Sequence, residues 1–71
     1  MKTLDLHGVK HEDVDRIVEN FVLLETPPLT IICGNSDRMI DLVRDTLDRL
    51  YDNDGISWHL SNHNTFKILN E

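Results

Sequence analysis

The segment "LDLHG", residues 4–8, begins like a buried strand and ends in a glycine. Because successive side chains of a strand point to opposite faces, its two leucines would share one face, and Asp5 and His7 would lie side by side on the other. Gly8 ends strand geometry at little cost, so this polar pair falls at the carboxyl end of the strand. In open α/β sheets that end is where ligands usually bind, so the segment predicts both a strand and a candidate site.

Hydrophobic periodicity downstream predicts two helices. Apolar residues in the range 11–25 recur at steps of three and four, which is one face of an amphipathic helix, and the prolines of "TPP", residues 26–28, end it. Ser36 is a natural N-cap for the second helix, and "YDNDG", residues 51–55, is typical of a turn. The inward stripe of the second helix is expected to be Met39, Ile40, Val43, Leu47 and Leu50.

Short apolar and alternating segments predict the remaining strands. "LTIICG", residues 29–34, reads as one strand, and the tail from residue 56 reads as two strands around the polar turn 61–64. The predicted order is therefore β-α-β-α-β-β. Right-handed crossovers then place both helices on one face of a four-stranded mixed sheet, an α/β two-layer sandwich that forms a single domain over residues 1–71. The open face is expected to carry Asp5, His7, Ser57, His59, Thr65 and Lys67.

Length and charge limit the classes of function. A chain of 71 residues buries only about 60% of its unfolded surface, so its core is thin. Thirteen acidic against seven basic residues give a net charge of -6, which weakens any general attraction to nucleic-acid phosphates or anionic membranes, so such binding needs a local patch. The single cysteine excludes an internal disulfide, and no membrane span or signal peptide is recognisable. We expect a soluble protein of a reducing cytoplasm, whether of the organism or of an infected host.

The motif and the order of elements resemble a known family. "LDLHG", an amphipathic helix, a strand ending in a glycine turn, a second helix and a final strand pair are similar to the Smr domain, the small MutS-related module, over roughly residues 4–69. The family is associated with nicking endonuclease activity on DNA or RNA and with RNA binding. Its functional residues are placed in the leading "LDxH" stretch, which matches here as Asp5 and His7, and in a later turn of the form H-G-x-G or T-G-x-G.

The second family turn is altered in this chain. It aligns with "CGNS", residues 33–36, where Cys33 stands in place of His or Thr and Ser36 replaces the second glycine. Adjacent parallel strands would nevertheless bring this turn and the "LDLHG" turn to one rim of the sheet. In a nucleic-acid-binding protein of this kind we expect contacts from Gly8, Lys10, Cys33, Gly34, Asn35, Ser36, Arg38 and Lys67, with the lysines steering the strand toward the two turns.

The resemblance also implies phosphodiester hydrolysis at Asp5 and His7. Histidine can move protons near neutral pH, so His7 would be the general acid or base, and Asp5 would orient it or a metal-bound water. The amides at the start of the second helix would receive a phosphate, although Asp37 repels it unless Arg38 offsets that charge. The alternative is an ordinary surface pair in which His7 bonds the adjacent loop.

Two further residues have a functional and a structural interpretation. Cys33 near a helix N-terminus and a histidine is a conceivable nucleophile, but a cysteine after "TII" is more often a small buried apolar residue, which we favour. Trp58 would be a stacking platform only on the open face. Its alternation with Ile56 and Leu60 favours a place in the core.

Histidine spacing does not indicate a tight zinc site. His7 and His11 are four residues apart, but Gly8 breaks the helix that this spacing needs, and His59 and His63 are separated by a probable hairpin turn. Asp5 leaves open a loosely held divalent cation, magnesium or manganese.

A second class of function remains open beside RNA or DNA binding. The chain would be a non-catalytic adaptor that binds a protein partner through its acidic second helix or its open sheet face, as a monomer or as a homodimer. The acidic run is otherwise the solvated side of that helix and consists of Asp37, Asp41, Asp45, Asp48, Asp52 and Asp54.

Overall fold

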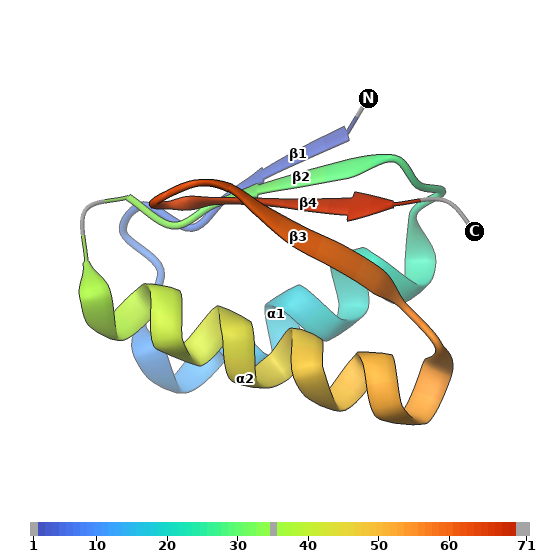
Figure 1. The fold of residues 1–71 in the computed structure, drawn as a ribbon. Coiled ribbons are helices and arrows are strands. Elements are labelled where there is room, and N and C mark those ends of the chain that lie inside the picture. Colours follow the sequence, from blue (N-terminus) through green and yellow to red (C-terminus); the bar gives the residue numbers. More distant parts are fainter. Residues whose placement is uncertain (1, 35, 70–71) are drawn as a thin grey trace.

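Two helices cover one face of a four-stranded mixed sheet in the computed structural model, which describes residues 2–34 and 36–69 (Figure 1). The elements, in chain order, are β1 (Lys2–Asp5), α1 (His11–Leu24), β2 (Leu29–Ile32), α2 (Asp37–Asp54), β3 (Ser57–Asn62) and β4 (Thr65–Leu69). This order confirms the predicted β-α-β-α-β-β architecture, with both helices in one layer below the sheet.

The sheet order is β1-β2-β4-β3, so the last strand in sequence lies inside the sheet. β1 and β2 are parallel, whereas β4 runs antiparallel to both of its neighbours. The ladder between the parallel strands continues one residue past β1, because the Leu6 N–H donates to the Ile32 carbonyl at 2.9 Å. The β3–β4 ladder is regular except for an irregularity between Leu60 and Asn62.

The core lies between the sheet and the two helices. β2 and β4 cover the core on the side of the sheet. On the side of the helices, every residue of the predicted inward stripe of α2 is buried. Each completely buried aliphatic or aromatic side chain contributes about 1.5–3 kcal/mol, so the fold depends on a short series of such residues. The largest of them are Phe66, Leu6, Leu29, Ile31, Leu47, Leu50, Ile68, Val14, Val18 and Val43.

Trp58 belongs to this core and not to the open face. It pairs with Ile68 across the β3–β4 ladder, and its ring meets Phe66 edge-on with centroids 5.4 Å apart and planes at 64°. The structure therefore confirms the core interpretation of Trp58 over the stacking platform.

The predicted turn at residues 51–55 is wrong for all but its last residue. α2 continues through Asp54, and Gly55 caps it in the left-handed conformation at φ 70°, donating its N–H to the Tyr51 carbonyl at 3.1 Å. The turn propensity of the Asp and Asn residues is overridden because Leu50 is anchored in the core and the glycine that ends a helix comes only at position 55.

A polar cluster joins the two helices at the edge of their contact, where Thr46 is buried and Asp15 is exposed. The Arg49 Nη2 lies 2.6 Å from Asp15 Oδ1 and 3.0 Å from Glu19 Oε1, and the Thr46 hydroxyl donates to Asp15 Oδ1 at 2.9 Å. The hydrogen bond from Arg49 holds the pKa of Asp15 below its ordinary value of 3.8, and the bond from Thr46 adds to this effect. This helix clasp, defined by these four residues, fixes α2 against α1.

We expect Asp15→Asn to lower the free energy of unfolding at neutral pH by about 0.5–1 kcal/mol, a modest value because the side chain is 66% exposed. The lowered pKa means that the carboxylate stabilises the fold above its ordinary pKa of 3.8 and loses this effect as the pH falls through the lowered value. The gap between wild type and variant, measured by urea unfolding, should therefore close as the pH falls below 3.8. Asp45→Asn, an exposed acid elsewhere on α2, is the control. A gap that stays constant across this pH range would show that the clasp does not act through the Asp15 charge.

Candidate functional site

Three turns meet at one end of the sheet. Because β1 and β2 are parallel and in register, the "LDLHG" turn and the turn at 33–36 leave the sheet side by side, as predicted. The β3–β4 turn at 63–64 joins them, since the Cys33 N–H donates to the Asn64 carbonyl at 2.9 Å. This end of the sheet is on the left of Figure 1. The third turn could not be foreseen from local sequence, because it comes to the rim only through the antiparallel pairing of β2 with β4.

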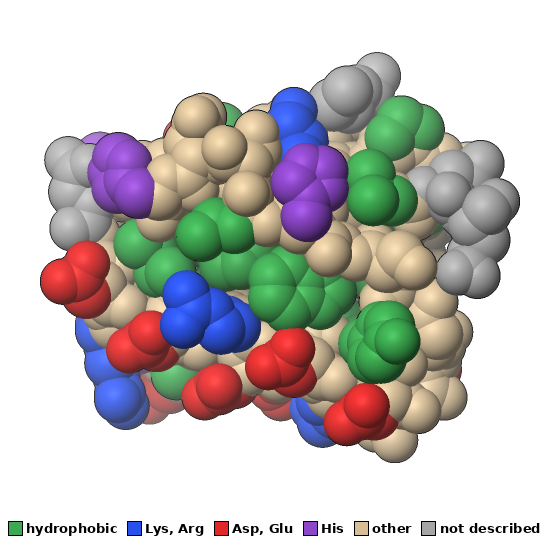
Figure 2. Space-filling model, in the orientation of Figure 1, with side chains coloured by type: hydrophobic (Ala, Val, Ile, Leu, Met, Phe, Trp, Pro, Cys, Tyr) green, Lys and Arg blue, Asp and Glu red, His purple; other side chains and the backbone are tan. Residues whose placement is uncertain are grey.

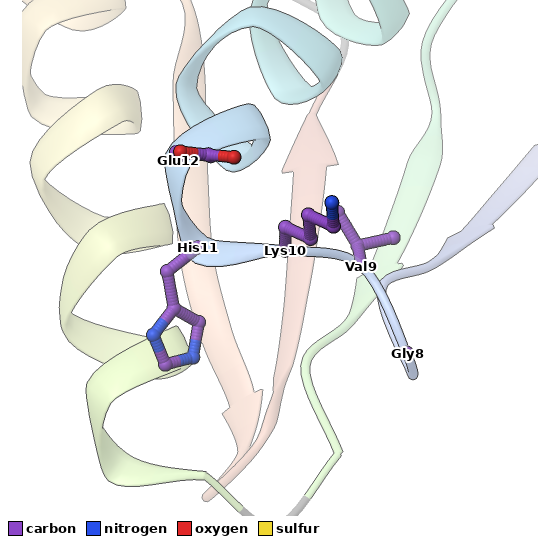
Figure 3. A pocket seen from close by; sticks show the side chains of 5 residues that line it. All are labelled: Gly8, Val9, Lys10, His11 and Glu12. Carbon is purple, nitrogen blue, oxygen red and sulfur yellow. The ribbon is translucent and has the colours of Figure 1, made fainter.

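The first two turns enclose a cavity of about 440 Å³, which we call the turn cleft. A more open hollow of about 620 Å³ lies beside it at residues 8–12, the start of α1. Figure 3 shows the His11 imidazole pointing toward the first turn of α2, with Glu12 directed elsewhere. The turn cleft is lined by Leu6, His7, Gly8, Val9, His11, Cys33, Gly34, Ser36 and Met39.

Asp5 and His7 do not share a strand face, which corrects the expectation from the alternation. β1 ends at Asp5, and the chain turns at His7 and Gly8, so His7 leaves the plane of the sheet. The Asp5 carboxylate instead accepts the backbone N–H of His7 at 2.9 Å and closes the turn itself. His7 is exposed and lines the turn cleft, whereas Asp5 does not line it.

Both turns need glycine for its backbone conformation, although a side chain at either position would have room. Gly8 has φ 84° and Gly34 has φ 76°, and a Cβ built at either position meets nothing within 4 Å. Any other residue would therefore cost about 1–2 kcal/mol in backbone strain alone. The absence of side chains at these positions leaves the backbone of both turns open toward the cleft.

The start of α2 is already capped by its own residues. The Ser36 hydroxyl accepts the Met39 N–H at 3.1 Å, which confirms Ser36 as the N-cap. Asp37 adds a carboxylate in the first turn. The N-terminus of α1 differs, because its N-cap, Lys10, makes no side-chain cap bond. The first turn of α1 nevertheless holds the carboxylates of Glu12 and Asp13, and the Asp13 N–H donates to the Lys10 carbonyl at 3.0 Å, so this helix start is no better placed for an anion.

Cys33 is a buried apolar residue. Its side chain is 2% exposed at the floor of the turn cleft, and burial raises the pKa of its thiol from 9.0 to about 11. A nucleophilic cysteine needs the opposite shift. The nucleophile interpretation is therefore wrong, and any contact that Cys33 makes with a nucleic acid would be through its backbone.

The other residues expected to contact a nucleic acid are dispersed. Lys10 borders the hollow beside the cleft, and Arg38 is exposed in the first turn of α2. Lys67 lies on the open sheet face, where its Nζ is 3.3 Å from the Thr30 hydroxyl, so it does not line the cleft. Asn35 lies outside the described residues.

Within residues 2–34 and 36–69, no group of three or more His, Cys, Asp or Glu side chains is placed to hold a metal ion. Asp5, the residue considered for a divalent cation, has its Oδ1 engaged by the His7 backbone. No step of the chemistry below is therefore assigned to a metal.

Comparison of the chain with known protein families, with curated proteins and with solved structures gives no significant match. The resemblance to the Smr domain thus depends on the "LDLHG" segment and the order of elements alone. Among the described residues, neither helix is both long enough and apolar enough to cross a lipid bilayer.

We expect Cys33 to react slowly with iodoacetamide in the native protein. A rise of the thiol pKa from 9.0 to about 11 lowers the thiolate fraction near neutral pH by about 100-fold, and burial adds steric protection. Mass spectrometry of the alkylated chain, with and without urea, measures the ratio of the two rates. Native alkylation as fast as in the unfolded chain would contradict the buried assignment.

Proposed function

We propose that the chain is an Smr-like nucleic-acid-binding protein that holds the sugar–phosphate backbone of a single strand in the turn cleft. The observation that supports this proposal is the convergence of the two motif turns: the "LDLHG" turn and the turn at 33–36 line one cavity together with two histidines. We place this activity in the cytoplasm, because the buried Cys33 stays a free thiol.

The chemistry of the cleft suits a phosphodiester. Imidazole side chains donate hydrogen bonds to phosphate oxygens, and the bare backbone at Gly8 and Gly34 lets a polymer approach closely. A volume of about 440 Å³ is within the usual range of small-ligand pockets, so it accommodates one or two nucleotides of an unpaired strand and not a duplex.

The charges around the cleft predict weak, local binding. Lys10 borders the neighbouring hollow and Arg38 lies in the first turn of α2, but Glu12 and Asp37 are close to them in sequence, and the chain as a whole carries -6. Few phosphates are then neutralised, and each contributes about -0.7 to the salt slope for a single strand. We expect a slope between about -1 and -2, far below that of a protein with a large basic surface.

Cleavage of the bound strand is a second function that the two histidines favour. His7 and His11 line the same cavity, whereas Asp5 is held by the backbone of the turn. One imidazole would accept a proton from the attacking water, and the other would protonate the oxygen of the leaving nucleotide as the phosphodiester bond breaks. In this proposal Asp5 shapes the turn that presents His7 and takes no part in proton transfer.

Binding is tested by amide NMR titration with a short single-stranded RNA, a single-stranded DNA of the same sequence and a DNA duplex, at low and then physiological salt. We expect shifts at the amides of residues 6–11 and 33–38 with the single strands, and at least five-fold weaker binding by His7→Ala. His59→Ala removes an exposed histidine on the open sheet face and serves as the matched control. Shifts that avoid both turns, or equal losses in the two variants, would refute the cleft as the binding site.

Cleavage is tested separately with end-labelled RNA and DNA. We expect His7→Ala and His11→Ala to abolish nicking while their thermal unfolding midpoints stay close to wild type, because both side chains are exposed. Asp5→Asn should keep most of the activity, since an amide oxygen can still accept the His7 N–H. Loss of nicking in Asp5→Asn would instead give the carboxylate a direct role, and full nicking by His7→Ala would remove His7 from the chemistry.

A further inference from the structure

β3 is an edge strand without the usual protection against pairing. It is the last strand in the order β1-β2-β4-β3, and no strand lies beyond it in the described part of the chain. In an antiparallel pair, alternate residues direct their N–H and C=O groups away from the partner, so an edge strand presents backbone hydrogen-bonding groups to solvent.

The two edges of the sheet differ in composition. β1 has four residues and carries Lys2 and Asp5, which is the common way to discourage pairing. β3 has six residues, "SWHLSN", with neither a charged residue nor a proline, and it pairs regularly with β4 as far as Leu60. The irregularity after Leu60 disturbs only the end of the strand.

The helix side of β3 is apolar and incompletely covered. Trp58 and Leu60 pair with the core residues Ile68 and Phe66 and so share their face, yet Trp58 is only half-buried and Leu60 remains 40% exposed. Figure 2 shows the resulting hydrophobic surface between β3 and α2, bordered along α2 by acidic side chains. We call this region the β3 groove.

The ridge of α2 that borders the β3 groove is acidic. Thr46 and Arg49 turn toward α1 in the helix clasp, so the residues on the other side of α2 face away from α1. At steps of three and four, that ridge consists of Asp37, Asp41, Arg44, Asp48 and Tyr51. Its one basic residue lies 3.7 Å from Asp41 in an ion pair, and Tyr51 is 60% exposed.

We propose that β3 binds an extended segment of a basic protein, which adds to the sheet as a fifth strand. Every second side chain of that segment would lie over the β3 groove. Lysine or arginine at these positions would cover Trp58 and Leu60 with its aliphatic stem and reach the aspartates of the ridge with its charged end. The backbone of β3 would supply the affinity, and the acidic ridge would select for basic partners.

A second copy of the chain fits this edge less well. Pairing of β3 with β3 about a two-fold axis would bring the acidic ridges of two chains together, and each chain carries -6. The surface is also distinct from the turn cleft, because neither Trp58 nor Leu60 lines that cavity. The inference therefore stands or fails independently of nucleic-acid binding.

The test uses an eight-residue peptide of alternating arginine and valine, titrated into the labelled protein and followed by amide NMR. We expect shifts along residues 57–62, slower hydrogen exchange of β3 amides, and weaker binding as salt is raised. A glutamate–valine peptide and an arginine peptide with prolines at alternate positions are the controls. Both should bind at least ten-fold more weakly, the first through its charge and the second because proline at every second position removes half of the backbone N–H donors and disfavours strand pairing.

Variants locate the site on the protein. Leu60→Lys places a charge on the edge strand and should weaken peptide binding at least ten-fold without unfolding the chain, since this side chain is partly exposed. Leu24→Lys, at a leucine that is 79% exposed on α1, is the matched control and should bind like wild type. Equal binding of the proline-containing peptide, or shifts confined to α2, would overturn strand addition. Self-association of the chain that Leu60→Lys abolishes would make the occupant a second copy and overturn the basic partner.

Discussion

The antiparallel pairing of β4 with β2 is the interaction on which the rest of the structure depends. It places Phe66 and Ile68 against Leu29 and Ile31 at the centre of the hydrophobic core. It also ties the β3–β4 turn to the end of β2 through the backbone bond between Cys33 and Asn64. Because β4 occupies the position beside β2, β3 is displaced to the edge. This strand pair therefore determines that the β3–β4 turn lies at the rim and that β3 is an exposed edge strand.

Most of the fold was predictable because periodicity and capping are local properties. The buried stripe from Met39 to Leu50 and the cap at Ser36 follow from residues within a few positions of one another. The order of strands was not predictable in this way, since β4 could satisfy its own pattern beside β3 alone. The end of α2 differs from the predicted turn for a related reason. The turn propensity of Asp52 and Asn53 contributes less free energy than the burial of Leu50.

The candidate site was predicted in position but not in its detailed contacts. Parallel pairing of β1 and β2 was enough to bring the two motif turns together. The role of Asp5 depends on where the strand ends, and a single residue of difference moves His7 from the sheet face into the turn. A carboxylate two residues before a histidine can thus accept a hydrogen bond from the backbone N–H of that histidine and not from its imidazole. The sequence pattern is the same in both cases, and the end of β1 at Asp5 distinguishes them.

The central position of β4 also has a consequence for the order in which the protein becomes stable during synthesis. The strand that closes the core is the last element of the fold to leave the ribosome, after β1, β2 and both helices. Until then the segment from β1 to α2 lacks the aromatic and aliphatic side chains of β4, and the inner edge of β2 has no partner. Contacts between distant parts of the chain form slowly and leave apolar surface exposed in the meantime. Before β4 is added, the segment from β1 to α2 therefore leaves part of its apolar surface uncovered.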